Sequence, residues 1–167
     1  MTLGRRAALT LFSHEVLLER GQTFAVAESL TGGALGAAVT SLPGVSATFR
    51  GGVIAYSTEL KAELLGVDRG LLADRGPVDP DVAIAMAEGV RDRLGAAWGL
   101  STTGVAGPDP QDGHPPGEVY VGVAGPGGFT RVADLRFSGD RDSIRGDTVE
   151  AALWILHEAL LDGNAAG

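Results

Sequence analysis

The chain of 167 residues contains no cysteine. A thiolate nucleophile, a disulfide framework and a cysteine-ligated zinc or iron–sulfur site are therefore excluded. Long apolar runs are also missing, and no stretch approaches the roughly eighteen uninterrupted apolar residues of a membrane-spanning helix. Charged residues interrupt the N-terminal segment, which leaves no apolar core for a secretory signal. We therefore expect a cytoplasmic protein with no membrane role.

Positive charge is scarce and comes almost entirely from arginine. The chain has 13 basic and 21 acidic residues, a net charge of −8 and no basic run. Such a balance repels a phosphate backbone, so nucleic acid is not an expected partner, although a local pocket can still hold a small phosphate. The only lysine is Lys61. Codon bias explains the excess of arginine, and Lys61 is either an ordinary lysine or a position that needs a side chain able to lose its proton.

Length and apolar spacing predict one domain, residues 1–167, with an α/β fold. Helices are expected over residues 3–20, 34–42, 58–65, 80–94 and 141–161, and strands over residues 23–27, 52–56, 98–103, 119–124 and 129–137. This order predicts a three-layer α/β/α sandwich with a mixed, mainly parallel sheet, followed by a C-terminal hairpin plus helix.

Cap and loop signals refine this prediction. Thr58 and Asp79 are expected to cap the helices that follow them, and Pro80 suits the first helical position. Residues 104–117 hold eight glycines and prolines among fourteen residues, which excludes regular structure there. A loop of that length in a compact domain is usually functional or disordered.

Residues 28–33, Glu-Ser-Leu-Thr-Gly-Gly, lie where a strand is expected to end and a helix to begin. Amide groups in such a turn can form an anion-binding nest, into which Ser29 would project. The alternative is a helix cap with glycines for a tight turn. The spacing fits no phosphate loop or dinucleotide fingerprint, and Ala27 and Thr31 occupy the positions where a nucleophile elbow has glycine.

Residues 56–61, Tyr-Ser-Thr-Glu-Leu-Lys, place Tyr56 and the unique Lys61 at the next strand-to-helix junction. Leu60 occupies the position of the lysine in both the Tyr-x-x-x-Lys and the Ser-x-x-Lys patterns, so neither fits. Ser57 lies four residues before Lys61 on one helical face and is therefore a rival nucleophile to Ser29. The alternative is a solvated Lys61 with Tyr56 in the core.

Two further segments could bind a ligand. Gly104 and Gly107, after the strand expected over residues 98–103, would let the backbone approach a ligand closely. Arg141 and Arg145 lie four residues apart at the start of the last helix, where they suit a phosphate or carboxylate, although a surface salt-bridge network is the commoner use. The three histidines are scattered along the chain, so we predict no metal.

Five segments together carry a resemblance to a known family: residues 28–33, 56–67, 76–78, 103–108 and 137–141. In combination they resemble the CinA C-terminal domain, the nicotinamide-nucleotide amidase family, over nearly the whole chain. The resemblance implies an amidohydrolase that converts nicotinamide mononucleotide to nicotinate mononucleotide and ammonia in pyridine-nucleotide (NAD) recycling. The loop after Pro108 departs from the family pattern. The longer members also carry an N-terminal nucleotide-hydrolysing domain that this sequence lacks, so no activity of that domain is expected.

The resemblance also implies roles for individual residues. Ser29 would be the catalytic nucleophile, and Lys61, uncharged, would take its proton directly or through Tyr56. Amides near Gly32, Gly33 or Gly104 would stabilise the oxyanion. No cofactor is expected, and we expect a homo-oligomer. The alternative function is a catalytically silent nucleotide-binding or competence- and DNA-damage-related interaction module of the same fold. Residues expected to bind the small-molecule nucleotide substrate are Thr31, Gly32, Gly33, Thr103, Gly104, Gly107, Arg141 and Arg145.

Overall fold

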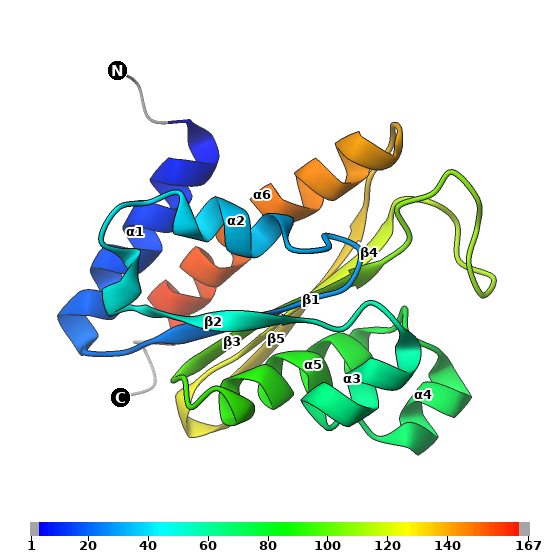
Figure 1. Cartoon of the computed structure of the whole chain (residues 1–167), viewed down its shortest axis with the longest axis horizontal. Coiled ribbons are helices and arrows are strands. Elements are labelled where there is room, and N and C mark those ends of the chain that lie inside the picture. The colour runs from blue at the N-terminus through cyan, green and yellow to red at the C-terminus, as the bar shows by residue number, and fades with distance from the viewer. Residues whose placement is uncertain (1–3, 164–167) are drawn as a thin grey trace.

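A five-stranded sheet forms the middle layer of the computed structural model, which describes residues 4–163 (Figure 1). Across the sheet the strands follow the order β2-β1-β3-β4-β5. β1 runs parallel to both of its neighbours, and β4 is antiparallel to β3 and β5. The predicted mixed sheet with its C-terminal hairpin is confirmed, although only the β2-β1-β3 part pairs in parallel. The strands are β1 (Phe24–Glu28), β2 (Phe49–Ile54), β3 (Trp98–Gly104), β4 (Glu118–Ala124) and β5 (Thr130–Arg136).

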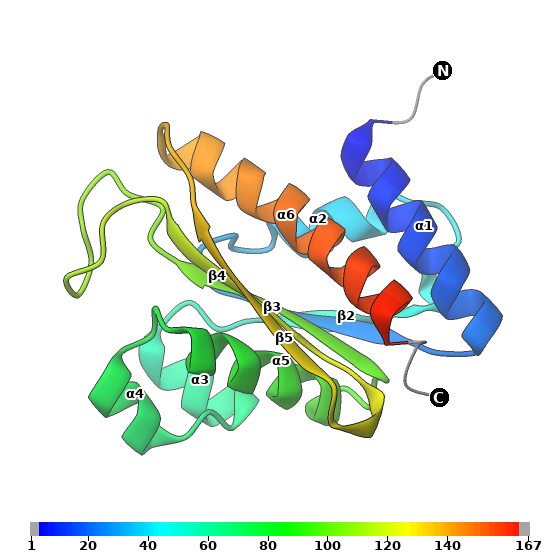
Figure 2. The same ribbon diagram turned by 180° about the vertical axis from the view of Figure 1, so that it is seen from behind.

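Helices cover both faces of the sheet, as the two opposite views show (Figures 1 and 2). One face carries α1 (Arg5–Arg20), α2 (Ala34–Thr40) and α6 (Arg141–Asp162). The other face carries α3 (Thr58–Leu65), α4 (Arg69–Arg75) and α5 (Pro80–Arg93). The predicted three-layer α/β/α sandwich is confirmed. The helix expected to begin at residue 3 begins at Arg5 within the described residues, and residue 3 itself lies outside them.

Strand β1, the second strand of the sheet, is buried on both sides because it lies between the two helical layers. Its alternate residues Phe24 and Val26 pack into the apolar cluster formed with α1, α2 and α6. Ala25 and Ala27 pack into the second cluster, formed with α3 and α5. A strand covered on both faces is a near-continuous apolar run in the sequence, and β1 is apolar over residues 24–27 before it ends at Glu28. The two clusters together fix where β1 ends, directly before Ser29.

Strand β2 begins three residues earlier than the expected strand over residues 52–56 and ends at Ile54. The difference arises from Gly51 and Gly52, which look like a strand boundary in the sequence but lie inside the strand. A side chain at Gly52 would come within 2.6 Å of Val26 on β1, so glycine is required there by the close approach of the two strands.

Two helical segments differ from the sequence prediction. α2 ends at Thr40 rather than at residue 42, and a 3₁₀ helix (Val45–Ala47) follows it. α4 has no counterpart among the expected elements, because it is only two turns long and carries little apolar periodicity. Its start nevertheless has a signal, since the Asp68 side chain caps it by accepting a hydrogen bond from the amide of Gly70.

The cap of α5 is confirmed and that of α3 is wrong. Asp79 accepts hydrogen bonds from the amides of the first turn of α5, with Pro80 at the first helical position. At α3 the cap is Ser57 rather than Thr58, and its Oγ accepts a 3.4 Å hydrogen bond from the amide of Leu60. Both residues can cap a helix, so composition alone does not decide between neighbouring hydroxyls.

The long segment between β3 and β4 projects beyond the carboxyl ends of β1 and β3 (Figure 1). Residues 105–117 are irregular as predicted, apart from an isolated bridge between Gln111 and His114, whereas Gly104 is the last residue of β3. The start of α6 and the turn between β1 and α2 approach the same end of the sheet (Figure 1). Among residues 4–163, every helix is too short or too polar to cross a membrane.

Candidate active site

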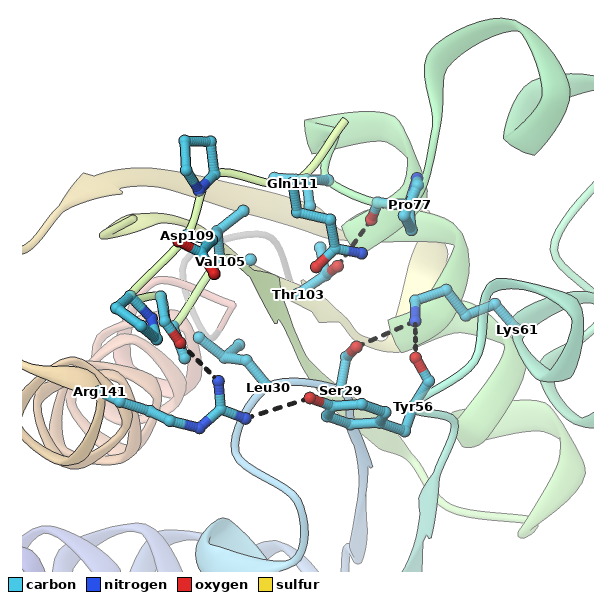
Figure 3. A pocket seen from close by; sticks show the side chains of 16 residues that line it. Ser29, Leu30, Tyr56, Lys61, Pro77, Thr103, Val105, Asp109, Gln111 and Arg141 are labelled. Atoms are coloured by element: carbon cyan, nitrogen blue, oxygen red, sulfur yellow. Dashed lines mark hydrogen bonds between the residues drawn. The ribbon is translucent and has the colours of Figure 1, made fainter. Parts of the chain in front are cut away.

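A cavity of about 270 Å³ opens at the carboxyl ends of β1 and β3 (Figure 3). The turn after β1, the segment between β2 and α3, the long loop after β3 and the first residue of α6 all contribute to its wall. Ligands in α/β folds commonly bind at this edge of the sheet. The cavity brings together these residues predicted for the site: Ser29, Tyr56, Lys61, Thr103, Gly104, Gly107 and Arg141.

Lys61 is buried, with 1% of its surface exposed, although it lies on the short amphipathic helix α3. Its Nζ lies 2.9 Å from Ser29 Oγ, 2.7 Å from the carbonyl oxygen of Ala55 and 3.4 Å from that of Tyr56. Removal from water penalises the charged ammonium, so burial lowers the pKa of Lys61 to about 8. Lys61 is therefore not the solvated helix lysine that the sequence left open.

Ser29 occupies the turn between β1 and α2 and is buried. Its amide donates a 3.1 Å hydrogen bond to the carbonyl oxygen of Thr102, which continues the pairing of β1 with β3 beyond the end of the strand. Ser57 has a different environment, because its Oγ caps α3 and it is exposed. Of the two rival serines, Ser29 is the one with a hydrogen bond to Lys61.

The buried carboxylate of Glu28 occupies the N-terminus of α2, where the sequence predicted a nest for a ligand anion. Its Oε1 accepts hydrogen bonds from the amides of Gly33 and Leu35, at 3.2 and 2.9 Å, and its Oε2 accepts one from Gly36 at 3.0 Å. The amide of Gly32 donates to the carbonyl oxygen of Ser29. The expected anion nest is therefore wrong, because these amides already have acceptors within the protein.

Residues Thr31 and Arg145 brace the Ser29 turn instead of lining the cavity. The hydroxyl of Thr31, fully buried, is 2.8 Å from that of Thr102 on β3. Arg145 donates to the carbonyl oxygens of Leu30 and Thr31, both at 3.0 Å. The predicted substrate-binding residues that do not line the cavity are thus Thr31, Gly32, Gly33 and Arg145.

Arg141 and Tyr56 meet across the mouth of the cavity (Figure 3). The guanidinium of Arg141 donates to the carbonyl oxygen of Gly107 at 2.7 Å and to the hydroxyl of Tyr56 at 3.2 Å. Tyr56 is 60% exposed, so it is not a core residue. These contacts hold a cation at the opposite end of the cavity from Lys61.

Several cavity residues have no assignment in the sequence analysis. Pro77 precedes α5, and its carbonyl oxygen accepts a 2.6 Å hydrogen bond from the hydroxyl of Thr103. Leu30, Asp109 and Gln111 also line the cavity. The density of glycine and proline over residues 104–117 marks the loop that carries Asp109 and Gln111, but it does not say which side chains face inward.

The chain is similar to known proteins over nearly its whole length. A model of the CinA C-terminal domain matches residues 7–160. The chain belongs to this family. A CinA-like protein of Frankia casuarinae is 52% identical over 145 residues, covering 87% of this chain and 33% of that protein. A CinA-like protein of Gloeobacter violaceus is 46% identical over 158 residues, covering 93% and 37%. The chain thus spans about a third of the length of these relatives.

Solved structures of CinA proteins have the same fold. A competence-damaged protein (CinA) superfamily protein of Klebsiella pneumoniae superposes with a TM-score of 0.89 at 30% identity, covering 96% of this chain and 99% of that one. A competence/damage inducible protein of Agrobacterium tumefaciens gives 0.90 at 30% identity, covering 95% and 99%. The family resemblance and the fold class are confirmed. The names of these relatives refer to competence and damage rather than to a reaction.

Proposed function

We propose that this CinA domain is an amidohydrolase that converts nicotinamide mononucleotide to nicotinate mononucleotide and ammonia, with Ser29 as the nucleophile. The observation that carries the proposal is the 2.9 Å contact between Lys61 Nζ and Ser29 Oγ inside a cavity. A serine hydroxyl is a weak nucleophile and needs a neighbouring base to take its proton. With a pKa of about 8, about one Lys61 in ten is uncharged at neutral pH, which supplies such a base.

The contacts of Lys61 also determine which way the lone pair of its uncharged amine points. An uncharged amine has two N–H groups and one lone pair. The carbonyl oxygens of Ala55 and Tyr56 accept hydrogen bonds and cannot donate them. When Lys61 is uncharged, both N–H groups can stay on these carbonyls, which leaves the lone pair for the hydroxyl proton of Ser29.

The proposed reaction has two halves. Ser29 Oγ attacks the carboxamide carbon as Lys61 takes its proton, and the resulting ammonium returns that proton to the leaving nitrogen, so that ammonia departs and an acyl ester remains on Ser29. Water then attacks the ester carbon, Lys61 accepts the water's proton, and the proton passes to Ser29 Oγ as the acid leaves. Lys61 ends each cycle uncharged and Ser29 ends it protonated.

The phosphate of the proposed substrate needs a cation in a protein of net charge −8. Arg145 is committed to the carbonyl oxygens of Leu30 and Thr31. Arg141 lines the cavity and is hydrogen-bonded only to a carbonyl and a phenol, with no carboxylate neutralising it among the described residues. We therefore assign the phosphate to Arg141.

The direct test is ammonia release from nicotinamide mononucleotide. We expect Ser29→Ala to release none while still binding the nucleotide. Ser57→Asn is the matched control, because asparagine can still cap α3 but has no hydroxyl, and we expect it to stay close to wild type. Ser29→Ala turning over normally beside an inactive Ser57→Asn would contradict the assignment. Nucleotide binding by wild type without ammonia release would favour the silent binding module.

A further inference from the structure

Gln111 extends from the loop after β3 into the cavity. Figure 3 shows its carboxamide on the side of Thr103 and Lys61, and farther from Arg141 in that view. None of the hydrogen bonds drawn among the cavity residues involves this carboxamide. A carboxamide offers two N–H donors and one oxygen acceptor. Gln111 therefore presents both kinds of polar group to whatever occupies the cavity.

The backbone that carries Gln111 is held from outside the cavity. Gln111 and His114 exchange two backbone hydrogen bonds, at 3.0 and 2.8 Å. His114 Nδ1 contacts the Glu118 carboxylate at 3.0 Å, and that carboxylate also accepts a 2.8 Å hydrogen bond from Tyr120. Burial alone would raise the pKa of Glu118, but the hydrogen bonds from Tyr120 and His114 and the charge of Arg136 outweigh it and hold that pKa below its ordinary value. The loop is thus anchored to β4 by an ionised carboxylate.

Thr103 completes the polar wall below Gln111. Its hydroxyl donates a 2.6 Å hydrogen bond to the carbonyl oxygen of Pro77. A carbonyl oxygen can only accept a hydrogen bond, so the hydroxyl proton is committed to this contact. Thr103 Oγ1 can therefore only accept hydrogen bonds from a group in the cavity. Gln111 Oε1 accepts as well, and Gln111 Nε2 donates. This wall matches a planar group with N–H donors and a carbonyl oxygen.

We propose that Gln111 is a specificity-determining residue that, together with Thr103, selects a primary carboxamide over the corresponding carboxylate. The two N–H bonds of a primary carboxamide find acceptors on Thr103 and Gln111, and its oxygen finds the Gln111 amide. A carboxylate brings no N–H and places its charge against the lone pairs of Thr103. The inference rests on the proposed function, whose substrate and product differ in this group alone. It explains how the product acid would leave the site in favour of new substrate.

The experiment measures equilibrium binding, so that turnover does not disturb it. Nicotinamide mononucleotide and nicotinate mononucleotide are titrated into Ser29→Ala protein by calorimetry, with and without Gln111→Ala. We expect nicotinamide mononucleotide to bind at least about tenfold more tightly than nicotinate mononucleotide. Gln111→Ala should weaken the binding of nicotinamide mononucleotide about 5–30-fold, the effect of losing two neutral hydrogen bonds. The affinity for nicotinate mononucleotide should change less than about twofold. Asp112→Asn, in the same exposed turn but outside the cavity lining, should change neither.

A second variant separates hydrogen bonding from loss of bulk. Gln111→Glu keeps the size of the side chain and a hydrogen-bond acceptor but adds a negative charge. It should therefore bind nicotinamide mononucleotide more tightly than Gln111→Ala does, and it should bind nicotinate mononucleotide much more weakly than the parent protein does. Equal weakening of both ligands by Gln111→Ala, or no weakening of either, would overturn the inference. Ammonia release is measured separately in proteins with Ser29 intact. Release of ammonia without a Gln111-dependent preference overturns the inference alone, and a preference without release overturns the proposed reaction alone.

Discussion

Arg141 and Arg145 lie one helical turn apart on α6 and contact different partners. Arg145 supports the backbone of the Ser29 turn, whereas Arg141 reaches over the cavity to Gly107 and Tyr56. Their four-residue spacing suits a phosphate or carboxylate as well as a surface salt-bridge network, and we expected both arginines to bind the substrate. The prediction failed for Arg145 because exposed carbonyl oxygens in a tight turn compete for the same guanidinium, and spacing along a helix does not reveal such acceptors.

We therefore predict that Arg141→Ala weakens binding of nicotinamide mononucleotide far more than binding of nicotinamide riboside, which lacks the phosphate. The expected difference is about tenfold or more, because charge-assisted hydrogen bonds to a phosphate contribute about 1.5–3 kcal/mol. Titration calorimetry with both ligands measures it, and the control is Arg75→Ala, a half-exposed arginine at the end of α4 that does not line the cavity. Equal losses for the two ligands would remove Arg141 from phosphate recognition.

The other residues of the site could be predicted from the sequence to different degrees. Ser29 and Lys61 could be predicted because each belongs to a segment that resembles the family, and because Lys61 is the only lysine. Their 2.9 Å contact could not, since it depends on how β1 and α3 pack across β2. No role was predicted for Glu28 or Gln111, because their functions follow from the path of a turn and of a loop rather than from a motif.

The short helix α2 depends on the Glu28 carboxylate at its N-terminus. A helix N-terminus carries unpaired amides and a partial positive charge, and Glu28 supplies acceptors and the opposite charge at once. The turn that holds Ser29 runs from this carboxylate into α2. A seven-residue helix would be marginal without such a cap.

We predict that Glu28→Gln lowers the free energy of unfolding by about 2–4 kcal/mol, since it removes the charge and places an NH₂ group against amide N–H groups inside the protein. Denaturation by urea measures the change. Glu59→Gln in the first turn of α3 is the matched control, because Glu59 is exposed, and it should cost less than about 0.5 kcal/mol. A loss no larger for Glu28→Gln than for the control would show that the cap does not hold the turn.

Elements with several agreeing signals were predicted well, and β2 was not. α5 has an acidic cap, a proline at its first position and an apolar face, all of which point to the same start. β2 contains Gly51 and Gly52, a pair that is typical of a boundary in the sequence. Gly52 has no side chain to block the close approach to β1, and Gly51 adopts a positive φ of 137° that favours glycine. The local pattern and the tertiary requirement conflict there, and the tertiary requirement prevails.

Folding places the only lysine of the chain inside the protein, which makes the free energy of unfolding depend on pH. The pKa of Lys61 is lowered from 10.5 in the unfolded chain to about 8 in the folded one. Below pH 8 the folded protein carries the full cost of a buried ammonium. Between pH 8 and 10.5 the unfolded chain binds more protons than the folded one, so stability contributed by this group rises with pH.

We predict that the free energy of unfolding of wild type, relative to Lys61→Met, increases by about 3 kcal/mol between pH 8 and 10.5. Taking the difference between the two proteins cancels the titration of other groups. Chemical denaturation at several pH values gives the slope. A difference that stays flat across this window would mean that Lys61 titrates normally and is not desolvated.

The layered architecture followed from the order of elements, whereas the position of the site followed from the direction of the strands. Parallel pairing of β1 with β3 brings the segments after both strands to one edge, where the general rule for α/β sheets places ligands. The short helix α4 has a local signal only at its Asp68 cap, and the inward-facing side chains of the long loop depend on packing that no local pattern encodes.

Proton transfer from Ser29 to Lys61 can be tested by measuring the rate of ammonia release by Lys61→Arg and Lys61→Met. Arginine cannot lose its proton at useful pH, and methionine has none to exchange. We predict that both variants fold and lose roughly 10²–10⁴-fold in turnover, and that the ascending limb of the wild-type pH–rate profile near pH 8 disappears. A folded variant within a factor of about three of wild type, under about 1 kcal/mol of barrier, would contradict proton transfer to Lys61.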